Sequence, residues 1–241
     1  MENLKVLEIR PYMQYESYTT EYLREFAKRG IDYYIFLARG ESEGIDEPRI
    51  INGEGISIWF IDKIIGTPYP LLNVARFREF LKVLSPDRIL IDNHLFFSSF
   101  QAYRLLRHMR QKFILRMHGV YALRSGIVNR VQALYLKTVS KTLTENAAKV
   151  ILLSKSLAKK TINIFRIPPE KVCIIPNGVS LELFKPSKKL QNLIVWIGRM
   201  VPEKNLFMLL KAIKFLRYNL KEREFKLVMI GEGPLFSHLI H

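Results

Sequence analysis

The chain of 241 residues contains one cysteine, Cys173, so an intramolecular disulfide is excluded. No apolar run reaches the roughly 18 residues that a membrane-spanning helix requires. The opening Met-Glu-Asn-Leu-Lys-Val-Leu lacks the basic start and long apolar stretch of a signal peptide. These absences favour a reducing compartment, and the expected location is cytoplasmic. Hydrophobic residues make up 49% of the chain and charged residues 25%, which is typical of a globular protein and excludes a fibrous one.

Several motifs of known chemistry are also missing. The first expected βα turn, residues 10–15, contains no glycine, so a dinucleotide-binding fingerprint is excluded. None of the 12 glycines precedes a lysine, which excludes a Walker-type phosphate loop. The single cysteine and the five histidines form no zinc-site pattern, and no Asp-x-Asp occurs. We therefore expect neither a metal ion nor a cofactor.

Acidic residues are scarce in one part of the chain. The sequence has 38 Lys+Arg and 22 Asp+Glu, for a net charge of +16, and residues 101–160 hold a single acid, Glu145. A positive field of this kind suits an anionic lipid surface, a phosphorylated small molecule or nucleic acid. A solvated, lysine-rich surface is the alternative. Nucleic acid is disfavoured because no aromatic stacking residues interleave with the basic ones.

Short apolar, β-branched runs alternate with amphipathic segments, which predicts strands alternating with helices. This alternation is typical of an α/β protein with a doubly wound, Rossmann-like parallel sheet. One expected helix contains Leu23 and Phe26 and ends near Gly30. The expected strands of this part are residues 4–9, 31–37, 56–61, 88–92, 113–117, 150–153 and 171–175.

A stretch rich in turn residues after Pro176-Asn177-Gly178 divides the chain. We predict a Rossmann-like domain over residues 1–186 and the start of a second one over residues 187–241. The second part is expected to contain a strand at 193–197, a helix at 202–218 and a strand at 225–230. One βαβ unit cannot cover both faces of a parallel sheet, so this part should be incomplete, expose apolar surface, and be mobile or pair with a second copy as a homodimer.

A candidate phosphate site follows the expected strand 193–197. Gly198 allows a ligand to approach the backbone, and Arg199 follows it in the loop. Because Pro202 suits the first position of a helix, Lys204 is expected in the first turn, at the positive end of the helix dipole. A guanidinium and an ammonium placed there would stabilise a diphosphate leaving group without a metal. Plain solvation of both side chains is the alternative.

Four short motifs near the domain junction occur in an order that resembles one enzyme family. They are Pro176-Asn177-Gly178-Val179, Phe184-Lys185-Pro186, Gly198-Arg199 with Lys204, and Gly231-Glu232-Gly233-Pro234. The set is similar to the central portion of the retaining, two-Rossmann-domain (GT-B type) glycosyltransferases of family four. The resemblance implies a nucleotide-sugar donor bound mainly by the second domain, with Arg199 and Lys204 as the donor-diphosphate pair, and an acceptor bound by the first.

The segment 113–119 is an expected strand that ends in His118-Gly119. It resembles the strand-end histidine of the family, which implies a catalytic role in which His118 hydrogen-bonds the donor sugar near the reacting carbon. A capping or solvent-facing histidine is the alternative. For His94 a structural role is favoured over lining the acceptor side. Ser154 is expected to cap the next helix through Leu157.

The chain departs from the family pattern in two places. The first βα loop, residues 12–17, lacks the glycine pair that the family often has there. The Glu-x7-Glu motif of the family lies well beyond residues 231–234, in a stretch that this chain lacks. We reject two chance matches, Glu8 with Glu16 and Glu224 with Glu232, because both fall across strand ends. We therefore expect the contacts to the donor ribose and sugar to be largely missing.

Basic residues recur at helical spacing in residues 130–141. Arg130, Lys137 and Lys141 fall within about 40° of one another on a helical wheel, which predicts a core-packed helix with a basic outer stripe. Such a stripe could dock on anionic lipid at the inner face of the cell membrane, and a solvated helix face fits equally. The apolar positions expected to lie toward the opposite side are Val128, Val131, Tyr135 and Val139.

Two functions follow from these observations. The leading interpretation is a metal-independent, retaining glycosyltransferase that moves a sugar from a nucleotide-sugar donor to a lipid-linked or polysaccharide acceptor, inactive if the missing portion is essential. The alternative is a non-catalytic, glycosyltransferase-like remnant that binds a partner or an anionic membrane surface. Binding of a nucleoside diphosphate distinguishes the two.

Overall fold

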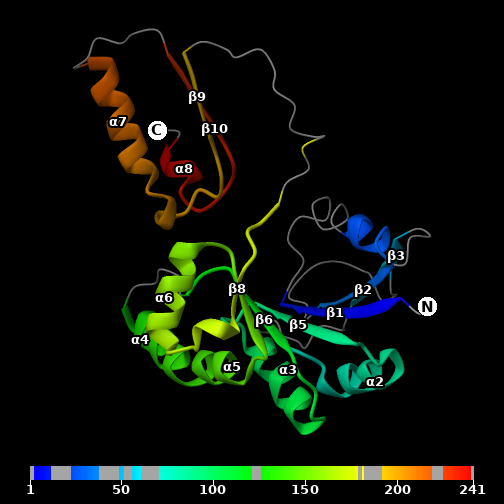
Figure 1. Ribbon diagram of the computed structural model, residues 1–241. Helices are drawn as coiled ribbons and strands as arrows, with labels where there is room; N and C mark the ends of the chain where they lie inside the picture. Colours follow the sequence, from blue (N-terminus) through cyan, green and yellow to red (C-terminus); the bar gives the residue numbers. More distant parts are fainter. Residues whose placement is uncertain are drawn as a thin grey trace. The chain divides into compact units, whose positions relative to one another are not determined.

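Two compact units make up the chain, Met1–Ser180 and Leu181–His241 (Figure 1). The boundary expected near residue 186 lies outside the described residues. Within the described part, no helix combines the length and the apolar character needed to cross a membrane. The computed structural model describes residues 3–11, 23–37, 49–51, 56–60, 71–120, 126–178, 181, 192–218 and 225–239.

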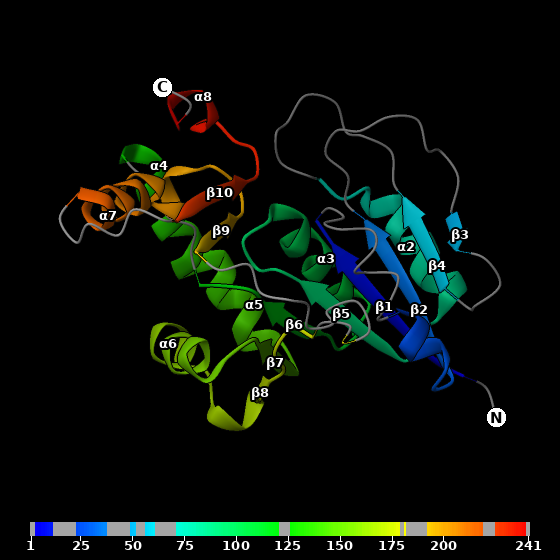
Figure 2. The same ribbon diagram turned by 90° about the horizontal axis from the view of Figure 1, so that it is seen from above.

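The first unit is built on an eight-stranded sheet with the strand order β3-β4-β2-β1-β5-β6-β7-β8 (Figure 2). Neighbouring strands are parallel except β3 and β4, which are antiparallel. The predicted α/β fold with a doubly wound parallel sheet is confirmed. The strands are β1 (Leu4–Arg10), β2 (Ile31–Leu37), β3 (Arg49–Ile51), β4 (Ile56–Phe60), β5 (Arg88–Asp92), β6 (Ile114–Met117), β7 (Lys149–Leu152) and β8 (Val172–Ile174).

Two helices in this unit, α2 and α6, begin where a side chain replaces a missing backbone partner. Asn73 Oδ1 accepts a hydrogen bond from the Arg76 amide, 3.2 Å away, and Ser154 Oγ accepts one from the Leu157 amide, 3.1 Å away. The predicted cap at Ser154 is confirmed. The helices are α2 (Val74–Leu84), α3 (Phe97–His108), α4 (Gly126–Tyr135), the π-helical turn η1 (Leu136–Ser140), α5 (Lys141–Asn146), α6 (Lys155–Phe165) and the 3-10 turn η2 (Pro169–Lys171).

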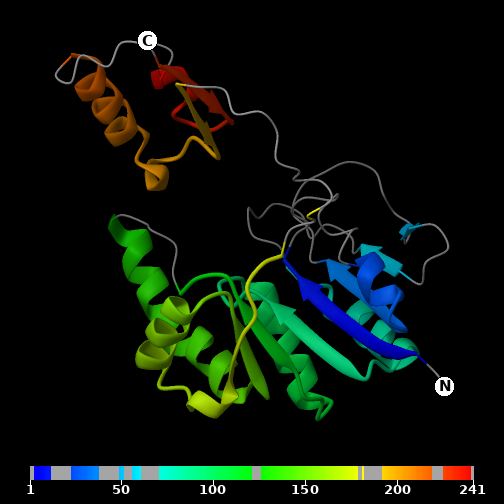
Figure 3. The same ribbon diagram turned by 45° about the horizontal axis from the view of Figure 1, so that its top comes forward.

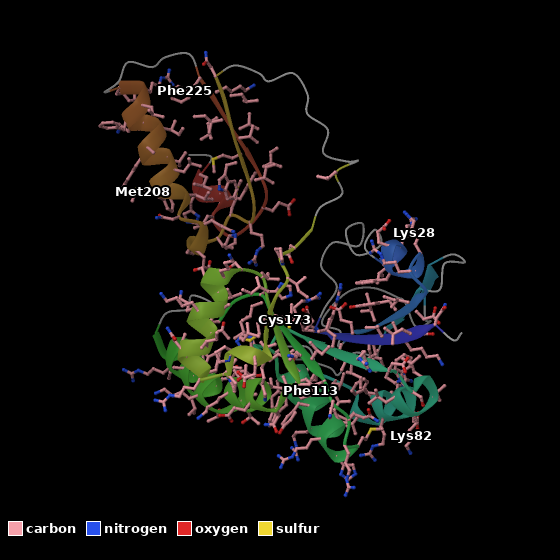
Figure 4. The ribbon with its side chains drawn as sticks, viewed as in Figure 1. Lys28, Lys82, Phe113, Cys173, Met208 and Phe225 are labelled. Atoms are coloured by element: carbon pink, nitrogen blue, oxygen red, sulfur yellow. The ribbon has the colours of Figure 1, made fainter. Side chains whose placement is uncertain are left out.

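The hydrophobic core lies between one face of the sheet and helices α2, α3, α5 and α6 (Figure 3). Strand side chains alternate between faces, so Leu7 and Ile9 of β1 enter this core while Glu8 points to the other face. Phe113, just before β6, lies against Tyr103 of α3 with ring centroids 5.8 Å apart (Figure 4). On the other face, the helical residues 23–27 pack on β2, where Phe26 stacks on Tyr33 with ring centroids 5.0 Å apart, and a cavity lies beside them.

The second unit contains two parallel strands, β9 (Leu193–Ile197) and β10 (Lys226–Ile230). The 3-10 turn η3 (Pro202–Lys204) and helix α7 (Leu206–Tyr218) follow β9, and α8 (Phe236–Leu239) follows β10. Leu206 is fully buried, but 73% of Ile197 and 59% of Met208 remain exposed (Figure 4). The predicted exposure of apolar surface in this part is confirmed.

Two expectations about the elements need correction, and one strand was not predicted. The helix expected over 202–218 is broken, because Asn205 adopts a left-handed conformation with φ of 49° and separates η3 from α7. Val131 does not pack into the core, since 64% of it is exposed. The short strand β3 was not predicted, because three residues are too few to show an alternating pattern.

Truncation of Phe77 tests the core between α2 and the sheet. Phe77 has no exposed surface, and its ring lies 4.6 Å from that of Phe36 in β2. We expect Phe77→Ala to lower the free energy of unfolding by about 3–5 kcal/mol, because it removes apolar contacts and leaves a cavity. Urea unfolding followed by circular dichroism measures the change. Val83→Ala, at a position on α2 that is 87% exposed, is the control and should change it by less than about 0.5 kcal/mol.

Candidate functional site

Polar side chains gather at the carboxyl ends of the central strands of the first unit. Arg10 ends β1, Asp92 ends β5, and His118 directly follows β6. Parallel strands bring these ends to one edge of the sheet, which is where α/β proteins place their ligands. Together with Asn177, which follows β8, they line one end of a cavity of about 750 Å³.

The remainder of this cavity runs along the sheet face opposite helices α2, α3, α5 and α6. Its lining there comes from alternate strand positions, among them Val6, Leu90, Ile114 and Ile151. The described residues that line the cavity belong to the first unit. They give it a polar end at the strand termini and an apolar floor.

The polar end is anchored by Glu8, a carboxyl group in β1 with no exposed surface. Its Oε2 accepts hydrogen bonds from Arg10 Nη2 at 2.7 Å and from the Tyr33 hydroxyl at 2.9 Å, and its Oε1 accepts one from Arg116. Burial, reinforced by the negative charge of Glu8, raises the pKa of Tyr33, so the phenol stays protonated and can donate. A carboxylate buried this deeply requires such partners.

Arg116 links this buried group to the strand ends. Its Nε donates to Asp92 Oδ1 at 2.7 Å, and His118 Nε2 lies 2.8 Å from the same oxygen. Burial would raise the pKa of Asp92, but the hydrogen bond from His118 and the positive charge of Arg116 outweigh it and lower the pKa to about 2. Asp92 is therefore ionised at neutral pH.

An ionised Asp92 fixes the proton position on His118. A carboxylate only accepts hydrogen bonds, so Nε2 of His118 must carry the proton. His118 lines the cavity, and its Nδ1 has no hydrogen-bond partner among the described residues. With 40% of its side chain exposed, His118 can hydrogen-bond a hydroxyl group of a bound ligand.

His94 belongs to the fold rather than to the cavity. It has no exposed surface, its Nε2 lies 2.9 Å from the Val120 carbonyl oxygen, and its ring meets that of Phe165 edge-on. Burial lowers its pKa to about 4, so the imidazole is neutral near pH 7. The structural role expected for His94 is confirmed.

In the second unit, the loops after β9 and β10 lie side by side. Gly198 donates its amide hydrogen to the Ile230 carbonyl oxygen at 3.0 Å, and Met200 donates to the Glu232 carbonyl oxygen at 2.6 Å. A Cβ atom on Gly231, whose φ is 150°, would lie 1.8 Å from the Gly198 carbonyl oxygen. Glycine is required there because the two backbones touch. Two motifs far apart in the sequence thus form one platform.

Arg199 and Lys204 lie on the β9 side of this platform. Both side chains are exposed, and neither forms an ion pair with another described residue. Lys204 lies in the 3-10 turn η3 and not in the first turn of α7, which corrects the expected position. The two cations remain within one short segment at the carboxyl end of β9, where an anion can reach them.

The three basic residues proposed as an anionic-surface stripe are exposed, as expected. Arg130 lies on α4, Lys137 in η1 and Lys141 at the start of α5. The π-helical turn η1 interrupts the α-helical spacing between Arg130 and Lys141, so a wheel of 100° per residue does not apply through the whole segment. Lys141 also lies 3.6 Å from Glu145, in an exposed pair.

Sequence reasoning missed the members of the buried network other than His118. A signal was present, because Glu8, Arg10, Asp92 and Arg116 interrupt apolar strands with charges of opposite sign, and buried charges require partners. Among the described residues, no group of three or more His, Cys, Asp or Glu side chains could hold a metal ion.

Comparison with protein families matches nearly the whole chain. Residues 15–183 match the family model described as "Glycosyltransferase Family 4", and residues 182–241 match the one described as "Glycosyl transferases group 1". The uncharacterised glycosyltransferase MJ1607 of Methanocaldococcus jannaschii is 23% identical over 215 residues, 81% of this chain and 54% of that protein. The uncharacterised glycosyltransferase YqgM of Bacillus subtilis is 29% identical over 124 residues, 50% of this chain and 33% of that protein.

Solved structures with the same fold include a synthase and a protein bound to a nucleotide sugar. A sucrose-phosphate synthase from Thermosynechococcus elongatus superposes with a TM-score of 0.70 at 15% identity, covering 95% of this chain and 62% of that one. HepE of Anabaena in complex with UDP-glucose superposes with a TM-score of 0.66 at 13% identity, covering 99% and 63%. The chain spans about half the length of MJ1607 and less than two thirds of these structures.

The lowered pKa of Asp92 predicts a pH-dependent contribution to stability. Folding lowers the pKa of Asp92 from 3.8 to about 2. At a pH above 3.8 the ionised side chain makes its full contribution to the stability of the fold. This contribution is lost as the pH falls from 3.8 toward 2. Urea unfolding of the wild type and Asp92→Asn from about pH 6 to about pH 2 should show a stability difference that shrinks by about 2 kcal/mol, mostly below about pH 4. A difference independent of pH contradicts the assignment.

The close approach of the two loops predicts that Gly231→Ala disturbs the platform. The added methyl group meets the Gly198 carbonyl oxygen, so we expect a loss of about 1–3 kcal/mol in the stability of the second unit. In a Trp59→Phe background, Trp196 of β9 is the sole tryptophan and reports on this unit by fluorescence during unfolding. Gly178→Ala, where a Cβ has open space, is the control. Equal unfolding of both variants would show that the loops do not constrain each other.

Proposed function

Because the chain belongs to Glycosyltransferase Family 4 and has the GT-B type fold, we propose that it transfers a sugar from a nucleotide-sugar donor to a lipid-linked or glycan acceptor. The observation that carries the donor assignment is the pair of exposed cations, Arg199 and Lys204, on the platform after β9. Crystal structures of HepE contain UDP and UDP-glucose, which supports a nucleotide sugar as the donor class.

The proposed role of the second unit depends on the positive charges that face the diphosphate of the donor. When the bond between the sugar and the diphosphate breaks, negative charge grows on the phosphate oxygens that depart. The planar guanidinium of an arginine and the mobile ammonium of a lysine both donate hydrogen bonds to these oxygens. They stabilise the growing charge more than they stabilise the intact donor, which lowers the activation barrier of the transfer. Arg199 and Lys204 supply both groups, so this proposal needs no metal ion. Transfer with retained configuration is proposed from the family alone.

The acceptor side rests on the cavity of the first unit. His118 lines its polar end, and the Asp92 carboxylate holds the imidazole by the 2.8 Å hydrogen bond. In our proposal His118 hydrogen-bonds a hydroxyl group of the sugar that is transferred or of the acceptor, and Asp92 acts as its positioning residue. The apolar floor formed by Leu90, Ile114 and Ile151 suits an acceptor with an apolar portion.

Titration calorimetry with UDP tests the donor site. We expect binding that Arg199→Ala and Lys204→Ala each weaken by about tenfold or more, because each removes a charge-assisted hydrogen bond. Arg217→Ala and Lys211→Ala make the same chemical changes at exposed positions on α7 and should leave the affinity unchanged. Absence of UDP binding by a folded wild-type chain would refute the donor assignment and favour the non-catalytic alternative.

A further inference from the structure

Helix α4 stands apart from the other elements of the first unit. Among the helices and strands, α4 mainly contacts η1, which continues the same helical segment along the chain. Figure 3 shows α4 at the outer end of this unit, beyond the helices that cover the sheet. By contrast, α2 and α3 contact each other, and α6 contacts β7, β8 and α5. An amphipathic helix normally buries its apolar side, so the apolar residues of α4 require another explanation.

The exposed apolar residues of α4 form a single ridge. Ile127 is 77% exposed, Val131 64% and Leu134 65%. They are four and three residues apart, which places them on one side of an α-helix within about 60° of arc. Scattered single apolar residues on a surface are ordinary, but three large ones in a row on one side of a helix mark an interaction surface.

Basic side chains flank this ridge. Arg130 lies on α4 about 60° from Ile127, and Lys137 follows in η1, both exposed. Residues 101–160 contain one acid, Glu145, and it lies beside Lys141 at the far end of the segment. An aliphatic ridge bordered by lysine and arginine without acidic residues complements an anionic, partly apolar surface. Protein interfaces, by comparison, are depleted of lysine and enriched in aromatic residues.

We propose that α4 attaches the protein to an anionic lipid bilayer, lying in the plane of the membrane surface. The ridge of Ile127, Val131 and Leu134 enters the boundary between headgroups and acyl chains, and Arg130 and Lys137 contact lipid phosphates. This attachment is separate from donor binding, which the second unit carries, so either property can fail without the other. For an acceptor held in a membrane, it brings the enzyme to its substrate.

Co-sedimentation with vesicles tests this attachment in the full chain. We expect binding to vesicles of phosphatidylcholine and phosphatidylglycerol that exceeds binding to phosphatidylcholine alone and weakens with added salt. Replacing the ridge by serine at all three positions should abolish sedimentation. Replacing Arg130 and Lys137 by glutamine should weaken binding to the anionic vesicles by about fivefold for each charge removed.

Control variants on α2 carry changes of the same chemical kind at another exposed surface. They are Val83→Ser for the ridge and Arg78→Gln with Lys82→Gln for the charges (Figure 4). These controls should sediment like the wild type, and circular dichroism should show that all variants fold. A polarity-sensitive fluorophore on Val131→Cys in a Cys173→Ser background should shift to shorter wavelength with vesicles, whereas one on Val83→Cys should not.

Four results of the vesicle experiments would overturn the proposal. They are no sedimentation of the wild type with anionic vesicles, equal sedimentation with neutral and anionic vesicles, an equal loss in the α2 controls, or an unshifted fluorophore at residue 131. A ridge that instead joins two copies of the chain would appear in analytical ultracentrifugation as a dimer that the serine variant dissociates, and this also excludes the lipid assignment. UDP affinity measured on the same ridge variant should equal that of the wild type, whichever result is obtained.

Discussion

A carboxylate with no exposure to water constrains the polar end of the first unit. Glu8 lies in the middle of a strand and must be matched by nearby donors, because an unpaired buried charge would cost far more than a fold of this size can tolerate. Arg116 meets part of that requirement from two strands away and also holds Asp92. Asp92 in turn fixes His118. The position of one imidazole at the mouth of the cavity therefore depends on a charge buried deep in the sheet.

This network also explains which parts of the structure the sequence could predict. Strands β2 and β5 were located to the residue because β-branched runs end sharply at turn residues. The role of Asp92 was missed because the apolar pattern alone does not show which charges pair across strands. The register of the sheet shows the pairing, because Asp92 lies opposite Arg116 in the β5–β6 pair. That register can be assigned only once the order of the strands is known.

The second unit shows a different limit. Gly198 and Arg199 were singled out as one motif and Gly231-Glu232-Gly233-Pro234 as another, and both lie on a single platform because β9 and β10 are neighbours in register. The position of Lys204 was predicted less well, because Pro202 starts a helical turn and Asn205 then ends it in a left-handed conformation. Residue types that tolerate two conformations leave this choice to the tertiary structure.

Each unit thus carries a separate part of the proposed reaction, with cations for a diphosphate in one and a positioned imidazole in the other. The claim on which the acceptor side depends is the proton position on His118. Nitrogen-15 NMR of the imidazole, in the neutral form, measures it directly. The account predicts one tautomer with the proton on Nε2 and an unprotonated Nδ1. A proton on Nδ1, or the averaged mixture of a free imidazole, would contradict it.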